Sequence, residues 1–97
     1  MEVRIQPIHF EIAQRLVDHI NKKAQRLERH FPNVTVLDVT LKVVKPETAM
    51  NKQAIIRIFQ PQENETVADK TADSFEEAVD VALEAAEHQL EKVMNRK

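Results

Sequence analysis

The spacing of the apolar residues changes along the chain, and this change limits the folds that the sequence can adopt. Between residues 11 and 31, apolar side chains recur every three or four positions, at Ile12, Leu16, Ile20, Ala24, Leu27 and Phe31. This spacing predicts one buried stripe on an α-helix. We expect the helix to end at Pro32, because proline cannot continue the helical hydrogen bonds. At its start, Ala13 stands where a capping residue with a side-chain oxygen would be expected.

Three segments after this helix, and one before it, are typical of β-strands. Residues 34–45 alternate in a way that predicts inward-facing Leu37, Val39, Leu41 and Val43. Residues 53–60 predict a second strand with Ala54, Ile56 and Ile58 toward the core, and residues 66–71 a weaker third. A short strand around Val3 and Ile5 precedes the helix and ends at Pro7. Residues 45–51 and 61–65 are expected to be loops.

A second helix is predicted from residue 74 onward. Ser74 and Glu77 have the spacing of a capping box, in which the serine oxygen and the glutamate carboxylate each accept a bond from a free backbone N–H. Apolar residues follow at helical spacing, at Val79, Ala82, Leu83, Ala86, Leu90, Val93 and Met94. The order is then β-α-β-β-β-α, with the first strand parallel to the second and the rest antiparallel. We therefore expect an α+β two-layer sandwich, a single domain over residues 1–97 with a four-stranded mixed sheet and both helices packed on one face.

Composition excludes several classes of protein. The chain has no cysteine and no glycine, so disulfides, thiolate chemistry and glycine-rich phosphate loops are not expected. No apolar stretch approaches the roughly 20 residues of a membrane helix, and the first ten residues lack the features of a signal peptide. The four histidines show no pair at metal-binding spacing, and Ser74 is better explained as a cap than as a nucleophile. We expect a cytoplasmic protein that is not an enzyme, needs no cofactor and does not bind a membrane.

Positive charge gathers in the first part of the chain. Residues 1–60 contain 10 Lys and Arg against 6 Asp and Glu, whereas residues 61–97 contain 4 against 10. The first helix carries one cationic stripe roughly opposite its apolar side, at Arg15, His19, Lys22, Arg26 and Arg29, with Lys23 beside it. Such a stripe could follow a phosphate backbone. The same pattern also occurs where Lys and Arg stems only cover apolar surface, so both interpretations stay open.

Two other surfaces have an unusual composition. The predicted second helix carries acids at spacings of three and four, which is typical of a solvated face, at Glu77, Asp80, Glu84, Glu87 and Glu91. The outward face of the strand over residues 53–60 carries Ile55, Arg57 and Phe59, which is more apolar than a freely solvated face. A weak homodimer through this sheet face is one hypothesis that follows.

Several short motifs carry a resemblance to a known family. The segment FEIA stands at residues 10–13, and Lys23, Arg26, Leu27 and Glu28 match a basic–x–x–basic–Leu–Glu pattern. Residues 78–80 match the family's Ala–Ile–Asp, and residues 89–92 its Gln–Leu–x–Lys. With these motifs the sequence resembles the ribosome hibernation proteins, the family of hibernation promoting factor and ribosome-associated inhibitor A, in its short form.

The resemblance implies a translation inhibitor of idle, stressed cells that binds rRNA of the small ribosomal subunit, in the channel used by messenger and transfer RNA. The rRNA-binding residues that it implies are Arg15, Lys22, Lys23, Arg26 and Arg29, with weaker contacts from Lys42, Lys45, Lys92, Arg96 and Lys97. The second helix departs from the family, because the family's basic positions are occupied by Ala85, His88, Val93 and Met94, and Glu84, Glu87 and Glu91 surround them. An alternative is therefore a protein-binding or self-associating module on the same fold that has lost ribosome binding.

Overall fold

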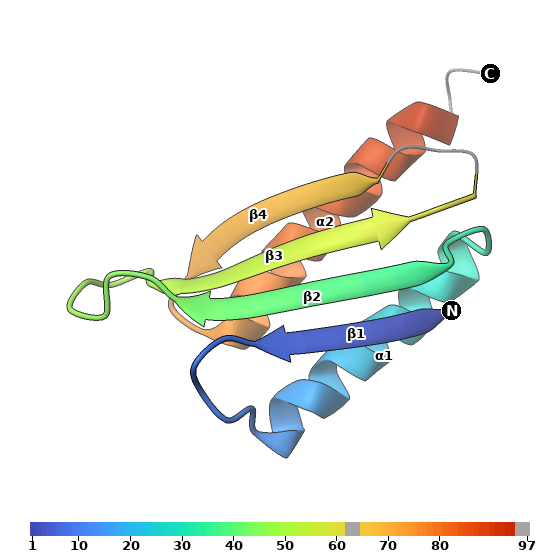
Figure 1. The fold of residues 1–97 in the computed structure, drawn as a ribbon. Helices are drawn as coiled ribbons and strands as arrows, with labels where there is room; N and C mark the ends of the chain where they lie inside the picture. Colours follow the sequence, from blue (N-terminus) through green and yellow to red (C-terminus); the bar gives the residue numbers. More distant parts are fainter. Residues whose placement is uncertain (62–64, 95–97) are drawn as a thin grey trace.

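The computed structural model describes residues 1–61 and 65–94, and its elements follow the predicted order (Figure 1). They are β1 (Glu2–Pro7), α1 (Gln14–His30), β2 (Val36–Val43), β3 (Lys52–Phe59), β4 (Thr66–Ala72) and α2 (Phe75–Met94). The strand predicted over residues 34–45 is two residues shorter at each end. At its start, the N–H of Val34 is used in the turn after α1, where it donates to the carbonyl of Phe31 at 3.1 Å.

The four strands form one mixed sheet in the order β1-β2-β3-β4. β1 is parallel to β2, whereas β2 with β3 and β3 with β4 are antiparallel. The parallel pair is joined through α1, and the antiparallel strands follow one another along the chain. The predicted four-stranded mixed sheet is thus confirmed.

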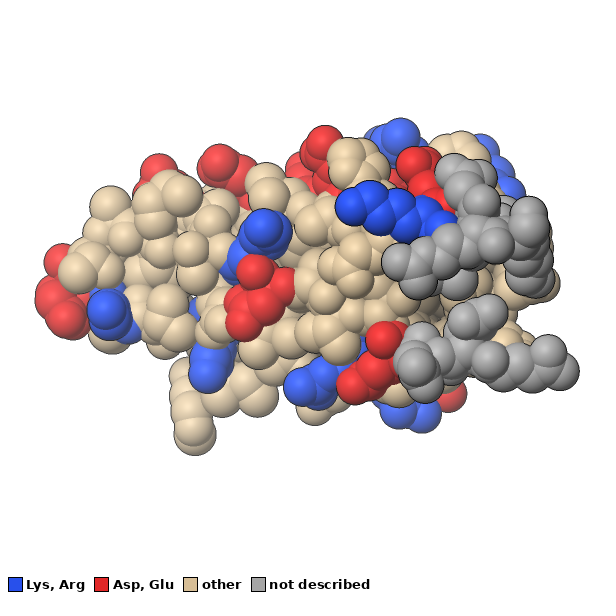
Figure 2. Space-filling view, turned by 90° about the horizontal axis from the view of Figure 1, so that it is seen from above, with Lys and Arg blue, Asp and Glu red and all other residues tan. Residues whose placement is uncertain are grey.

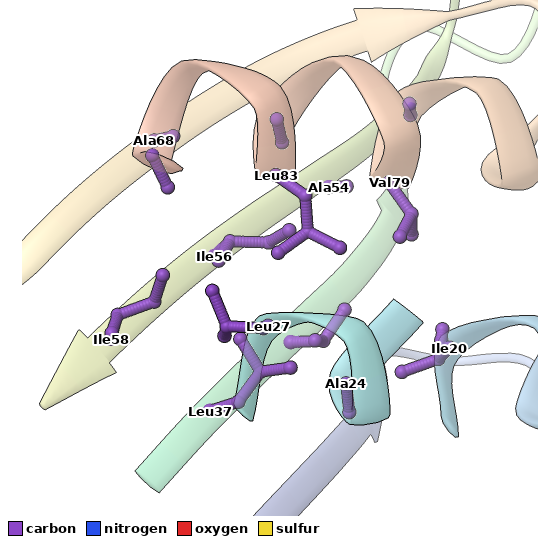
Figure 3. Packing of buried hydrophobic residues seen from close by; sticks show 14 of the residues in the cluster. Ile20, Ala24, Leu27, Leu37, Ala54, Ile56, Ile58, Ala68, Val79 and Leu83 are labelled. Atoms are coloured by element: carbon purple, nitrogen blue, oxygen red, sulfur yellow. The ribbon is translucent and has the colours of Figure 1, made fainter. Parts of the chain in front are cut away.

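Both helices cover the same face of the sheet and leave the other face open (Figure 1). Side chains from α1, α2 and the central strands meet between the two layers (Figure 3). Ile20, Leu27, Leu37 and Ile56 are completely buried there, and each large aliphatic side chain removed from water contributes about 1.5–3 kcal/mol. Val43 was predicted to point inward, but it is 38% exposed because it is the last residue of β2, at the end of the sheet.

The two helices begin differently. At the start of α2 the backbone N–H of Glu77 donates to Oγ of Ser74 at 3.1 Å, which confirms the serine cap. The reciprocal bond from Glu77 is not formed within the described part of the chain. At the start of α1, Ala13 has the extended backbone of a cap residue (φ −72°, ψ 144°) but no side-chain oxygen to accept a bond. Over residues 1–61 and 65–94, neither helix has the apolar length to cross a membrane.

Among the residues that the structure describes, three in loops have the left-handed backbone conformation that glycine adopts most easily. They are His9 (φ 62°), Lys45 (φ 49°) and Met50 (φ 54°), in a chain without glycine. The conformation costs a residue with a Cβ atom about 1 kcal/mol. Met50 is held in place because its N–H donates to the carboxylate of Asp73 at 2.8 Å. The connection between β2 and β3 therefore keeps a tight shape without glycine.

Candidate nucleic-acid interface

The buried side of α1 fixes where its charged residues lie. Leu16, Ile20, Ala24 and Leu27 are buried against the sheet. The other positions of the helix therefore face α2, the solvent or the edge strand β1. The predicted cations of α1 face either α2 or the solvent.

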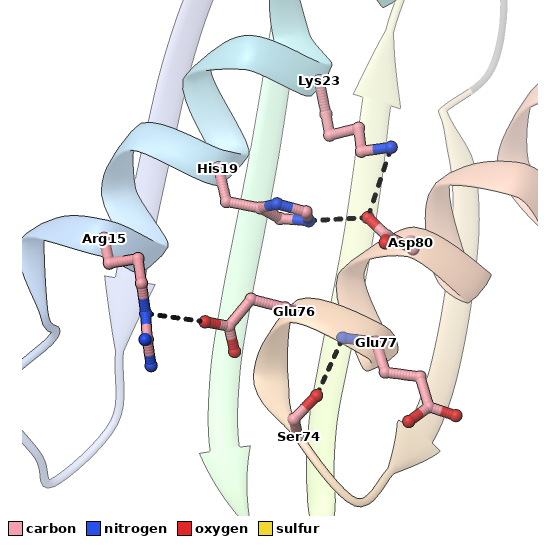
Figure 4. Close-up of polar contacts among 7 residues, drawn as sticks. All are labelled: Arg15, His19, Lys23, Ser74, Glu76, Glu77 and Asp80. Carbon is pink, nitrogen blue, oxygen red and sulfur yellow. Dashed lines mark hydrogen bonds and ion pairs between the residues drawn. The ribbon is translucent and has the colours of Figure 1, made fainter.

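One row of α1 faces α2 and is engaged by its carboxylates (Figure 4). Nε of Arg15 lies 3.6 Å from Oε2 of Glu76. Nε2 of His19 lies 2.7 Å from Oδ1 of Asp80, and Nζ of Lys23 lies 3.6 Å from the same oxygen. We call Arg15, His19 and Lys23 the paired row, because each of them already has an anionic neighbour.

A second row of α1 faces the solvent. It consists of Lys22, Arg26 and Arg29, which are all exposed. No carboxylate of the described residues lies within 4.0 Å of their charged groups. We call these three residues the open row. The predicted cationic stripe thus lies on one side of α1, and what the sequence did not indicate is that acids of α2 already pair with part of it.

A groove runs between the two helices beyond Asp80. Its α1 side is formed by Lys23 and by Arg26, so the open row is exposed to solvent but also borders this groove, and most of its α2 side is acidic. The α2 residues that line it are Asp80, Leu83, Glu84, Glu87, His88 and Glu91. The acids of α2, predicted as a solvated face, therefore lie in part along the cations of α1. A phosphate backbone would be repelled from the α2 wall and attracted to the open row.

The other predicted contact residues lie away from the open row. Lys42 is on the sheet face opposite the helices, since its neighbour Leu41 points into the core. Lys45 is in the loop after β2, at the end of the sheet where the helices begin. Lys92 is exposed in the last turn of α2. Arg96 and Lys97 lie outside the described residues.

The view from the side of β4 and α2 shows no purely basic surface. Lys and Arg side chains are interspersed there with Asp and Glu (Figure 2). Within the described ranges, no three His, Asp or Glu side chains come together as a metal site would require.

The carboxylates that engage α1 were not identified from the sequence. Glu76 and Asp80 are four residues apart, as are Arg15 and His19, so each pair lies on one side of its helix. This spacing was visible, but it does not tell which side of α2 faces which side of α1. Asp80 is 61 positions from His19, and only the packing of both helices on the sheet brings them together.

The fold and the open row define the class of protein. It is a small α+β domain that presents a basic helix face. Its described residues form no cluster that could hold a metal ion. Residues 3–97 match the family described as sigma 54 modulation protein / S30EA ribosomal protein, and the chain belongs to this family. The resemblance seen in the sequence is thereby confirmed.

Curated relatives support the assignment. A protein of Pseudomonas putida named ribosome hibernation promoting factor is 30% identical over 92 residues, which are 95% of this chain and 85% of that protein. A protein of Azotobacter vinelandii with the same name is 29% identical over 92 residues, 95% of this chain and 81% of that protein. These names describe ribosome factors rather than enzymes, in agreement with the prediction that the chain is not an enzyme.

Solved structures confirm the fold. A ribosomal subunit interface protein from Coxiella burnetii superposes with a TM-score of 0.85 at 18% identity, covering 98% of this chain and 99% of that one. The N-terminal domain of Thermus thermophilus Protein Y gives a TM-score of 0.78 at 20% identity, covering 96% and 99%. At this level of identity the likeness establishes the shared architecture.

Proposed function

We propose that the chain is a ribosome-associated factor of the hibernation type that acts in the cytoplasm. In this proposal residues 1–97 form one domain, which binds rRNA of the small subunit and inhibits translation. Membership of the S30EA family and the names of the curated relatives support the association with ribosomes. The observation that carries the rRNA contact is the open row, which remains available to an anionic partner.

The geometry of the open row suits a phosphate backbone. Lys22 and Arg29 are seven residues apart, which corresponds to about 10 Å along the helix axis. Arg26 lies between them on the same side. Each phosphate that these cations neutralise releases condensed counterions, so affinity should depend steeply on salt. Lys92 in the last turn of α2 adds a further cation, at the end of the molecule where α1 also ends.

The proposal is tested by cosedimentation of the protein with isolated small ribosomal subunits at low and moderate salt. Arg26→Glu/Arg29→Glu reverses two charges of the open row and should abolish binding. The matched control is Lys42→Glu/Lys45→Glu, which changes the net charge equally but lies on the weaker predicted contacts. It should reduce binding much less. Equal losses in both variants would show that net charge, and not the open row, accounts for binding.

A second candidate function is self-association through the open face of the sheet. Ile55 and Phe59 are half-buried on this face, and Val36 lies directly opposite Phe59 in the ladder. Val67 on β4 is 39% exposed and lies opposite Arg57. A sheet face with these apolar side chains and no helix above it offers area to a second copy.

A further inference from the structure

The acids of α2 lie where RNA phosphates would otherwise approach the paired row. Asp80 accepts from His19 and also lies 3.6 Å from the ammonium group of Lys23 (Figure 4). One helical turn earlier, Glu76 holds the same relation to Arg15. The paired row therefore has an internal anionic partner whenever no phosphate is bound.

We propose that Asp80 is an intramolecular competitor of RNA phosphate for Lys23. Asp80 would thereby decide whether Lys23 takes part in binding. The inference rests on the proposed binding of RNA by α1, and it adds a residue of α2 that regulates the strength of this binding.

The two contacts of Asp80 differ in a way that suits this role. The contact with His19 is a short hydrogen bond of 2.7 Å, so the carboxylate is held in position even when Lys23 leaves it. The contact with Lys23 is a looser ion pair. The Lys23 side chain is 32% exposed and that of Asp80 is 42% exposed, so water can replace either partner. An ion pair of this kind is weak and opens readily.

Lys23 can therefore exchange one anion for another. Turned away from Asp80, its flexible stem would bring the ammonium group toward the solvent side of α1, where Lys22 and Arg26 lie. A phosphate bound there would gain a third cation, at the expense of the pair with Asp80. The net gain in binding free energy is smaller than for a cation without an anionic partner, because the contact of Lys23 with phosphate replaces its contact with Asp80.

The opposite hypothesis is that Asp80 orients Lys23 for RNA. Under that hypothesis the removal of the Asp80 charge would lower affinity, whereas competition predicts a rise. The sign of the change thus separates the two. A rise by itself is not sufficient, however, because the loss of any acid near RNA reduces repulsion.

The experiment is a double-mutant cycle on Asp80 and Lys23, with Glu84→Gln as matched control. Glu84 lies one turn after Asp80, lines the same groove and forms no ion pair with a described residue. Affinity for isolated small ribosomal subunits is measured at several salt concentrations. Circular dichroism of each variant shows whether the fold is retained.

Competition makes three linked predictions. Asp80→Asn should raise affinity roughly two- to fivefold, the range expected when one exposed ion pair is released, and Glu84→Gln should raise it less. Asp80→Asn should also steepen the dependence of log affinity on log salt concentration by nearly one unit, since one more phosphate is neutralised. Lys23→Gln should have little effect in the natural chain but should cancel the gain in the Asp80→Asn background.

Other outcomes overturn the proposal in distinguishable ways. If Lys23→Gln lowers affinity equally in both backgrounds, Asp80 does not compete for Lys23. The same holds if Asp80→Asn and Glu84→Gln change affinity and its salt dependence by equal amounts. The proposed function stands in that case, provided that Arg26→Glu/Arg29→Glu abolishes binding. If the natural chain does not bind small subunits at low salt, the proposed function and this inference both fail.

Discussion

The rings of Phe10 and Phe75 are stacked, with centroids 4.8 Å apart and planes only 7° from parallel. Phe10 lies in the segment that leads from β1 to α1, and Phe75 is the first residue of α2. The contact therefore joins the beginnings of the two helices at one end of the molecule. It packs against the main core and helps to fix how α1 lies relative to α2. Glu76 directly follows Phe75, so its ion pair with Arg15 depends on how the two helices lie relative to each other.

Replacement of Phe10 by alanine should destabilise the protein by about 2 kcal/mol. The estimate is lower than for a fully buried phenylalanine because Phe10 is half-buried. Phe75→Ala should have a similar effect, and the double mutant should lose about 1 kcal/mol less than the two single losses together. Denaturant unfolding followed by circular dichroism measures all three values. Val81→Ala, at an exposed position of α2, serves as the control. Strictly additive losses would mean that the stacked pair contributes only by burial.

Stability should change in opposite directions at the two helix starts. Ser74→Ala removes the oxygen that accepts the N–H of Glu77 and should cost about 1 kcal/mol. Ala13→Asp introduces such an oxygen where the backbone already has cap geometry, and its negative charge also suits the positive end of the helix dipole. It should stabilise the protein by about 1 kcal/mol. Thermal unfolding of both variants checks the signs, and a loss of stability in Ala13→Asp would contradict the geometry of this cap.

Glycine should be favourable at position 50. Met50 has a left-handed backbone and is 50% exposed, so its replacement removes strain without opening the core. The hydrogen bond from its N–H to Asp73 is retained. Met50→Gly should therefore stabilise the protein by roughly 0.5–1 kcal/mol, even though glycine also increases the freedom of the unfolded chain. Urea midpoints measure the change, and Ala49→Gly in the same loop is the comparison.

Salt should weaken binding to the small subunit in proportion to the cations that contact phosphate. If Lys22, Arg26 and Arg29 each neutralise one phosphate of duplex rRNA, log affinity should fall with log salt with a slope of roughly −3. Arg29→Gln should make the slope shallower by about one unit. Filter binding from low to moderate salt provides the measurement. An unchanged slope in Arg29→Gln would remove this residue from the interface.

Periodicity was sufficient to predict the layers. The alternation in β2 and β3 placed Leu37 and Ile56 in the core, and the spacing in α1 did the same for Leu27. Such patterns state which side of an element is buried, because the period of a helix or strand relates neighbours along one element. They predicted the element order and the sheet face that carries both helices.

These patterns did not indicate which residues of one helix lie beside which residues of the other. The sequence placed Arg15 and Lys23 with the other cations of α1, but it could not indicate that Glu76 and Asp80 lie beside them. That neighbourhood depends on how two helices rotate and slide on a common sheet, which is decided by packing over the whole core. The left-handed residues, such as Met50, were equally hidden, since glycine is the usual sign of this conformation and the chain has none.

Self-association is the remaining prediction, and it concerns the face that the helices leave open. Phe59 and Ile55 point outward from the central strand β3, so their removal should weaken a dimer without emptying the core. We expect Ile55→Thr/Phe59→Thr to lower the apparent mass seen in sedimentation velocity at high protein concentration. Val81→Thr, at an exposed position of α2 on the helix side, should not change it. A natural chain that stays monomeric up to millimolar concentration would exclude this dimer. Because the sheet face and the open row lie on opposite sides of the molecule, the result is independent of whether the chain binds RNA.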